Sequence, residues 1–261
     1  MNRPMQDRSY LQLIELLHLM VLKELKVRYK RSVLGYLWAI ANPFAFSIVY
    51  WIAFKFIMRV QMENYIVFIL TGMFPWAWLT QSTIQGTASF TNNLSLVRRV
   101  KLPKLILPLS NVVQEMVHFV FAIPIIFFFI IITGEHINSL SFLWQIPLML
   151  VLEALFVFPL TIIGAVLNVY VRDVQYLVGI LFSALFFTTP MVYPLSMVPE
   201  GYQKYFKLNP AYWLIDSWRI VFAGDILPLE NFIYVLGSIV VFSLIAGWTY
   251  RKLATRIAEL V

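Results

Sequence analysis

The sequence predicts an all-α protein that crosses a membrane several times. Of its 261 residues, 61% are hydrophobic and 13% are charged, whereas soluble domains average roughly 45–50% apolar and about 25% charged residues. A helix needs roughly 20 mostly apolar residues to cross a bilayer. Six stretches of the chain meet this requirement, namely 33–58, 65–82, 105–133, 143–169, 176–192 and 232–250. We therefore expect six transmembrane helices.

The positive charge is distributed as in a membrane protein with a defined orientation. Most of the 20 Lys and Arg residues lie before the first span, in the second and fourth connections, and after the last span. Lys and Arg accumulate in cytoplasmic segments, so we expect a protein of the inner (cytoplasmic) membrane with both termini in the cytoplasm. The basic residues that give the chain its net charge of +7 are concentrated in the segments expected on the cytoplasmic side. The net charge therefore does not indicate a nucleic-acid partner. The polar segment 1–10 predicts no removable signal peptide.

An N-terminal arm, residues 1–31, precedes the transmembrane domain, residues 32–261. Over 9–31 its apolar and charged residues alternate as in an amphipathic helix that lies in the membrane interface. Such a helix either anchors the chain to anionic lipid or docks a partner, and both interpretations remain open. The basic residues suited to a lipid headgroup are Lys26, Arg28, Lys30 and Arg31.

The first and fifth spans each carry aromatic and hydroxyl side chains on one face. Pro43 lies inside the first span, where a proline kinks the helix and frees carbonyl groups that need a neighbour. Aromatic faces with nearby hydroxyls suit sugar rings, although ordinary helix packing would use the same residues. The residues predicted to line a channel are Tyr36, Ser47, Tyr50 and Phe54 in the first span, and Ser183, Phe186, Phe187 and Tyr193 in the fifth.

A compact basic cluster lies between the second and third spans. It comprises Arg98, Arg99, Lys101 and Lys104. No phosphate-binding loop accompanies it in the chain, so we expect any work that the protein does to be powered by a partner. The cluster predicts a short cytoplasmic element on which that partner docks.

Ionisable residues inside the spans are few, and such residues are usually functional or paired. Asn111, Glu115 and His118 are spaced i, i+4 and i+7, and they form a polar stripe on the third span. The stripe fits either a proton relay or a hydrogen-bonded cluster that fixes helix contacts. Glu153 is expected to stand alone in the fourth span.

The connection between the fifth and sixth spans is too long and too apolar for a plain loop. Asn209 followed by Pro210 predicts a helix start, because Asn supplies a capping acceptor and Pro fits the first turn. We expect two short re-entrant helices on the outer side, since charged residues make two further spans the weaker alternative. They comprise 199–206 and 211–223 within the outer segment 197–227.

Nothing in the sequence indicates catalysis or metal binding. The chain has no cysteine, and its three histidines are far apart along the sequence. It also lacks the ligand spacings of common metal sites and the motifs of catalytic nucleophiles. We therefore expect no catalytic residue, no metal and no cofactor in this chain.

Five segments of the chain form an ordered set that covers nearly its whole length. They are RYKRSVLGYLWAIANP (28–43), FPWAWLTQSTIQGTASFTNN (74–93), LVRRVKLPKLILPLS (96–110), VRDVQYLVGILFSALFFTTPMVYP (171–194) and LNPAYWLIDSWRIVFAGDILP (208–228). Each segment alone is a weak signal. Together they resemble the membrane subunit of ABC-2 type exporters, specifically the O-antigen and polysaccharide export permeases, of which capsular and teichoic acid export permeases are relatives.

The resemblance implies a homodimer that pairs with two copies of a cytoplasmic ATPase, which would bind ATP and Mg. A lipid-linked polysaccharide would pass between the membrane subunits, with the first and fifth spans lining its path and the re-entrant helices capping it. The arm would lie near the entering lipid pyrophosphate, and segment 92–104 resembles the family's coupling helix. The residues that would contact the ATPase are Leu96, Arg98, Arg99 and Lys101, together with Arg172 and Asp173 at a second contact.

Other functions remain as alternatives. The same architecture would serve the export of teichoic acid, capsule, or a small lipid or drug. An integral-membrane transferase would need carboxylates or histidines grouped at one membrane face. A proton-coupled carrier would depend on Glu115 and would not need ATP.

Overall fold

The computed structural model describes residues 5–28, 32–35, 37–99, 103–134 and 139–253, and every regular element in these ranges is a helix. The predicted all-α class is therefore confirmed. The helices are α1 (Met5–Arg28), α2 (Leu37–Ile52) with a π-helical turn (Ala53–Ile57), α3 (Tyr65–Thr87), α4 (Ser89–Asn92), α5 (Leu94–Arg99), α6 (Ile106–Thr133), α7 (Ser139–Tyr170), α8 (Val174–Thr188), a 3-10 turn (Leu195–Met197), α9 (Glu200–Lys207), α10 (Pro210–Phe222) and α11 (Leu229–Leu253).

Four segments within the described helices are long and apolar enough to cross a membrane, which identifies a multi-pass membrane protein. They are Ile40–Ile57, Ile106–Thr133, Ser141–Tyr170 and Leu229–Leu253. Helix α8 is apolar but shorter, and α3 is buried by its neighbours along most of its length. Each of the six apolar stretches in the sequence thus corresponds to a helix. Among the described helices, however, only four segments are both long and apolar enough to be candidate spans, so the count of six stays a prediction.

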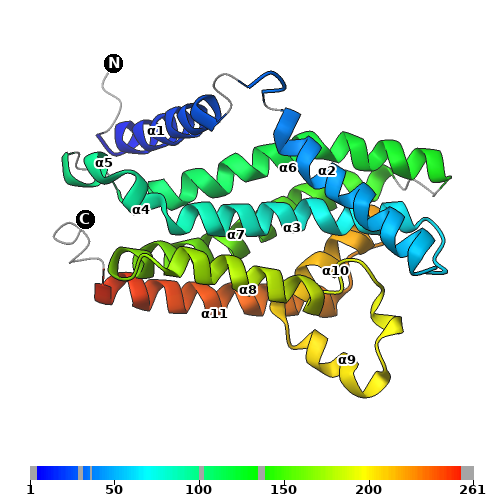
Figure 1. The fold of residues 1–261 in the computed structure, drawn as a ribbon. Helices are drawn as coiled ribbons and strands as arrows, with labels where there is room; N and C mark the ends of the chain where they lie inside the picture. Colours follow the sequence, from blue (N-terminus) through cyan, green and yellow to red (C-terminus); the bar gives the residue numbers. More distant parts are fainter. Residues whose placement is uncertain (1–4, 29–31, 36, 100–102, 135–138, 254–261) are drawn as a thin grey trace.

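Helix α3 lies at the centre of the bundle and packs against α2, α6, α7, α8 and α10 (Figure 1). The rings of Trp78 and Phe119 stack with centroids 5.7 Å apart. Phe119 in turn meets Trp218 edge to face at 4.8 Å. Aromatic pairs of this kind stabilise a fold by about 0.5–1.5 kcal/mol beyond their buried area. Aromatic packing therefore joins α3, α6 and α10.

Helices α3 and α7 approach each other closely at two glycines. A methyl group on Gly86 would lie 2.0 Å from Thr161 Cγ2, and one on Gly164 would lie 2.2 Å from Thr87 Oγ1. Small residues commonly allow such close contact between helices in membranes. Both threonine hydroxyls donate to the carbonyl four residues earlier in their own helix, which restricts their side chains. The contact between α3 and α7 therefore depends on the absence of side chains at these glycines.

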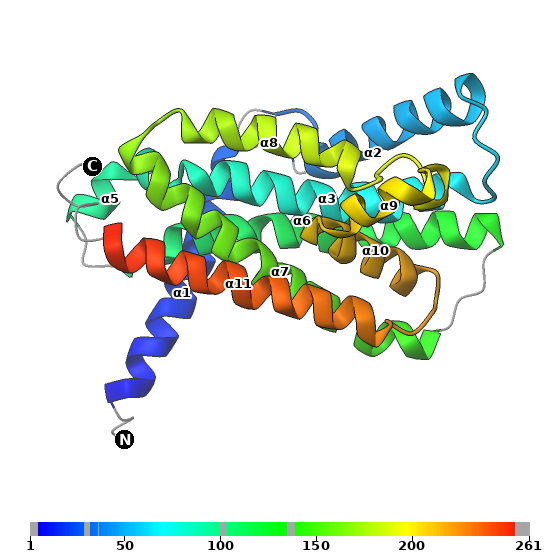
Figure 2. The same ribbon diagram turned by 90° about the horizontal axis from the view of Figure 1, so that it is seen from below.

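The two ends of the bundle carry different elements. Helix α5 and the carboxyl end of α11 lie at one end, and α9 and α10 lie toward the other (Figure 2). The Tyr170 hydroxyl at the end of α7 donates to the Leu253 carbonyl at 2.8 Å. Asn168 Nδ2, also near that end, donates to Thr91 Oγ1 at 3.4 Å. The turn between α7 and α8 therefore lies at the same end as α4, α5 and the end of α11.

The start of α10 follows the predicted capping pattern. Asn209 occupies the N-cap, its Oδ1 accepts a hydrogen bond from the Ala211 N–H at 3.0 Å, and Pro210 is the first helical residue. Asn209 Nδ2 also donates to the Thr189 hydroxyl at 2.8 Å, which ties α10 to the segment after α8. Gly224 follows the helix with φ at 84°, a conformation that favours glycine. Both predicted short helices are present, as α9 and α10.

Arg219 of α10 holds the segment that follows α8. Its Nη2 donates to the Pro190 and Met191 carbonyls at 3.0 and 3.1 Å, and its guanidinium lies 3.8 Å from the centroid of the Phe68 ring. A methyl group on Gly72 of α3 would lie 2.9 Å from the guanidinium. The glycine therefore leaves the space on α3 that the Arg219 side chain occupies. Hydrogen bonds to charged groups contribute about 1.5–3 kcal/mol each. Arg219 thus joins α3, α10 and the end of α8.

Glu153, expected to stand alone in the fourth span, has a partner on another helix. Its Oε2 accepts a hydrogen bond from the indole Nε1 of Trp218 at 2.5 Å, and both side chains are fully buried. Among the described residues, its Oε1 has no hydrogen-bond partner. The expectation of an isolated Glu153 is wrong because Trp218 is 65 residues away in sequence, and only the packing of α10 on α7 brings the two together.

Candidate functional site

The segment predicted to couple to an ATPase, 92–104, begins at the last residue of the short helix α4 and contains the short helix α5 (Figure 1). Asn93, between them, accepts a hydrogen bond from Lys23 Nζ of α1 at 3.2 Å. Val97 is buried in a cluster that includes Met20 of α1, and Leu96 packs against the same cluster. Helix α5 therefore shares an apolar cluster with α1, and the residue that precedes α5 is hydrogen-bonded to α1.

The structure describes the backbone of every predicted coupling residue except Lys101, which lies outside the described residues. Arg98 and Arg99 form the last turn of α5. Arg172 and Asp173 form the exposed turn between α7 and α8, where Asp173 holds the N-cap position without a side-chain cap bond. The two predicted contacts thus lie at the same end of the bundle, and their role stays a prediction.

The described part of the amphipathic arm is α1. Met20, Val21 and Leu25 are buried, whereas Leu11 and other apolar side chains of the helix are exposed and available to lipid. Of the basic residues predicted to meet a headgroup, Lys26 is exposed and Arg28 is the last residue of α1. Lys30 and Arg31 lie outside the described residues.

Four of the predicted channel-lining residues come together between α2 and α8. The ring centroids of Tyr50 and Phe186 are 5.3 Å apart, as are those of Phe186 and Phe187. With Ser183 of α8 and Trp76 of α3, these residues line a cavity of about 300 Å³. The predicted aromatic faces of the first and fifth spans therefore meet in the fold.

The remaining predicted lining residues differ in their surroundings. Ser47 is fully buried, and its hydroxyl donates to the Pro43 carbonyl at 2.7 Å. Phe54 lies half-buried in the π-helical turn. The Tyr193 hydroxyl donates to a backbone carbonyl near the end of α8. Tyr36 lies outside the described residues. The hydroxyls of Ser47 and Tyr193 thus both donate hydrogen bonds to backbone carbonyls of the same chain.

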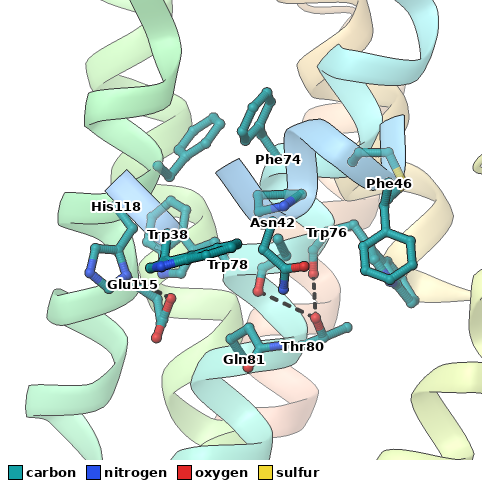
Figure 3. A pocket seen from close by; sticks show the side chains of 14 residues that line it. Trp38, Asn42, Phe46, Phe74, Trp76, Trp78, Thr80, Gln81, Glu115 and His118 are labelled. Carbon is teal, nitrogen blue, oxygen red and sulfur yellow. Dashed lines mark hydrogen bonds and ion pairs between the residues drawn. The ribbon is translucent and has the colours of Figure 1, made fainter. Parts of the chain in front are cut away.

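A larger cavity, which the sequence did not predict, lies between α2, α3 and α6 (Figure 3). Its volume of about 500 Å³ is within the range of about 300–1,000 Å³ that is usual for small-molecule sites. We call it the Glu115 pocket. It is lined by Trp38, Asn42, Pro43 and Phe46 of α2, by Met73, Phe74, Trp76, Ala77, Trp78, Thr80 and Gln81 of α3, and by Glu115, His118 and Phe119 of α6.

A hydrogen-bonded group connects α3 and α6 at the Glu115 pocket. Glu115 Oε2 lies 2.9 Å from His118 Nδ1, and Gln85 Nε2 donates to Glu115 Oε1 at 3.1 Å. Of the two interpretations of the polar stripe, this geometry favours the cluster that fixes helix contacts. Asn111 bonds to the Leu107 carbonyl of its own helix at 2.9 Å. The described cluster therefore contains Gln85 in addition to the predicted Glu115 and His118.

A sequence signal for this pocket exists in α3. Gln81 and Gln85 are four residues apart within the largely polar run 80–87, and they face the same side of the helix. Gln85 Nε2 donates to Gln81 Oε1 at 3.2 Å. Uncharged polar groups inside a membrane also require hydrogen-bond partners, so this pair of amides indicates a polar contact between α3 and a neighbouring helix.

Comparison with known proteins identifies the class of this protein. Residues 15–223 match the family of the ABC-2 type transporter, so the chain belongs to this family. It is 38% identical over 251 residues to the O-antigen export system permease protein RfbA of Klebsiella pneumoniae, which covers 95% of this chain and 96% of that protein. The protein of the same name from Myxococcus xanthus is 31% identical, with 92% of each chain covered. The polysialic acid transport protein KpsM of Escherichia coli is 24% identical over 76% of this chain and 77% of its own.

Proposed function

We propose that this chain is the membrane-spanning permease half of an ATP-driven ABC exporter that moves a lipid-linked polysaccharide of the O-antigen type across the inner membrane. The observation that carries the proposal is the similarity to the two RfbA proteins, which extends over at least 92% of this chain. The similarity to the polysialic acid transport protein KpsM is lower, and it makes polysialic acid the second candidate.

The proposed assembly is a homodimer with two copies of a cytoplasmic ABC ATPase. Segment 92–104 would dock on the ATPase as a coupling helix, and the turn at Arg172 and Asp173 would make the second contact. The placement of α5 and this turn at one end of the bundle supports the proposal, because one partner could touch both. ATP and Mg would be bound by the partner, and the present chain would act as a transport subunit without catalysis.

The proposed topology has six membrane-crossing helices with both termini in the cytoplasm. Helices α2, α3, α6, α7, α8 and α11 would cross, and α9 and α10 would enter the membrane from the outer side without crossing it. This arrangement is supported by the position of α9 and α10 opposite α5 and the end of α11 (Figure 2). The exposed apolar side chains of α2 and α8 would face lipid or the second protomer.

The first test is made in cells of the source organism that lack this chain. We expect surface polysaccharide to disappear and lipid-linked polysaccharide to accumulate in the inner membrane, because synthesis continues while export stops. Expression of the wild-type chain should restore the surface polymer. Immunoblots of whole cells and of extracted lipid-linked material measure the two pools. Unchanged surface polysaccharide in the deletion strain would contradict the proposal.

A further inference from the structure

We propose that Arg219 of α10 is a positioning residue for the transport path, because it holds residues 189–192 and, through them, the carboxyl end of α8. We call these four residues the α8 extension. The inference rests on the proposed function, in which α8 lines the path, and it adds a residue on which that lining depends. Arg219 is not among the described residues that line the cavity between α2 and α8, so it would act through the backbone of the α8 extension.

Helix α8 has few buried contacts of its own within one protomer. Of its 15 residues, only Phe182 and Phe186 are buried. Leu177 and Ile180, on its exposed face, are 61% and 67% exposed. Side-chain packing along the helix therefore restrains α8 only in part, and the contacts made at its two ends contribute to its position.

The α8 extension is buried, although it contains no regular helix. Three of its consecutive carbonyls accept hydrogen bonds from side chains of other helices. Arg219 Nη2 donates to the Pro190 and Met191 carbonyls, and the Tyr65 hydroxyl of α3 donates to the Val192 carbonyl. Buried carbonyls outside regular helices need such partners. Side chains of α3 and α10 therefore determine the course of the α8 extension beside α10 (Figure 1).

Arg219 serves two of these three carbonyls, and its own position is fixed. Its Nη2 lies 3.0 and 3.1 Å from the two oxygens, and the guanidinium lies 3.8 Å from the centroid of the Phe68 ring. A guanidinium is planar and always charged, so its N–H groups point in fixed directions. Without Arg219, two buried carbonyls would lose their donors, and the α8 extension would have to move to find others.

The carboxyl end of α8 carries the aromatic lining that such a movement would displace. Phe186 and Phe187 lie three and two residues before the extension, and the ring of Phe186 lies 5.3 Å from that of Tyr50 on α2, centroid to centroid. Directly after the extension, the Tyr193 hydroxyl donates to the Phe187 carbonyl. Displacement of the extension would therefore shift Phe186 relative to Tyr50. The aromatic lining thus depends on α10 through Arg219.

Cross-linking tests this dependence directly, because the chain has no cysteine of its own. Tyr50→Cys with Phe186→Cys places one thiol on α2 and one on α8 of the full chain, which is purified with its ATPase in lipid nanodiscs. A short bifunctional thiol reagent joins them, and mass spectrometry of the peptides gives the rate. We expect Arg219→Met, added to this pair, to lower the rate at least tenfold.

The matched control removes a cation from the same end of the bundle. Lys204 of α9 is exposed, so Lys204→Met should leave the cross-linking rate unchanged. Arg219→Lys is the second variant in case Arg219→Met does not assemble. It keeps a cation without the planar donors of Arg, and we expect the rate to fall at least threefold. An unchanged rate in the assembled Arg219 variants, or an equal fall in the control, would overturn the proposal.

Transport per ATP separates misplacement of α8 from a simple loss of stability. A less stable complex loses ATP hydrolysis and transport together, whereas a displaced lining lowers the transport obtained per ATP. We expect this ratio, measured in sealed vesicles without the added cysteines, to fall at least fivefold in the Arg219 variants. An unchanged ratio would refute the role of Arg219 alone. A wild-type complex that transports no polysaccharide would refute the proposed function.

Discussion

Gly86→Ala is expected to destabilise the folded protein by about 3 kcal/mol, at the upper end of the effects of overpacking. The added methyl group would lie 2.0 Å from Thr161 Cγ2, and Thr161 cannot rotate away without losing its hydrogen bond to the Val157 carbonyl. For chains of this size, each kcal/mol shifts the unfolding midpoint by about 2–4 °C. We therefore expect the midpoint in detergent, followed by fluorescence-detected size exclusion, to fall by about 6–12 °C.

A second substitution in the same contact should reverse this loss. Thr161→Ser removes Cγ2 and keeps the hydroxyl, so the double variant Gly86→Ala with Thr161→Ser should recover most of the lost stability. The matched control is Gly179→Ala in α8, where an added methyl group meets nothing within 4 Å. Because Ala favours helix over Gly by about 1 kcal/mol, the control should be unchanged or slightly stabilised. Equal midpoints for Gly86→Ala and Gly179→Ala would contradict a close contact between α3 and α7.

The double variant Arg98→Glu with Arg99→Glu is expected to lose its ATPase partner and to abolish export. The two residues end α5, within the segment 92–104 that we propose as the coupling helix. Reversal of two charges at a docking surface replaces attraction by repulsion, and close charge pairs across interfaces contribute about 1.5–7 kcal/mol. We expect at least a hundredfold less ATPase to co-purify, since about 2.7 kcal/mol corresponds to that factor. Quantitative mass spectrometry of the tagged chain, purified from its native membranes, measures the ratio.

The control for this variant reverses two neighbouring charges elsewhere at the same end of the bundle. Arg251 and Lys252 lie in the last turn of α11 and are exposed, so Arg251→Glu with Lys252→Glu makes the same change in charge. It should retain the partner. If both double variants lose the ATPase alike, the loss reflects overall charge. If Arg98→Glu with Arg99→Glu keeps a full complement of ATPase, the coupling role of this segment is wrong.

Local chemistry made several elements predictable from the sequence. Asn209 and Pro210 specify a helix start through their own side chains, and the structure has that start at the expected residues. Long apolar runs predicted α6, α7 and α11. A helix must contain roughly 20 mostly apolar residues to cross a membrane, and few other structures require apolar runs of that length. The pairing of Glu115 with His118 was also foreseeable, since residues three apart on a helix face the same side.

Features that depend on contacts between distant segments were not predictable. The partner of Glu153 is Trp218, and no periodicity links the two. The close contacts of α3 at Gly72 and Gly86 depend on the facing side chains of Arg219 and Thr161, which the local sequence does not identify. The Glu115 pocket likewise takes its walls from three helices. The position of a residue on one face of a single helix does not show which neighbours bury it, and Ser47 is fully buried in the fold.

The proposed function requires this chain to form a transport path that is powered by a separate ATPase. Its most direct test is transport of a lipid-linked polysaccharide in sealed vesicles that contain the purified chain with or without its ATPase. We predict that transport requires both subunits and ATP, and that it stops with a non-hydrolysable ATP analogue. Transport by the chain alone, driven by a proton gradient and lost in Glu115→Gln, would contradict this account and identify a proton-coupled carrier.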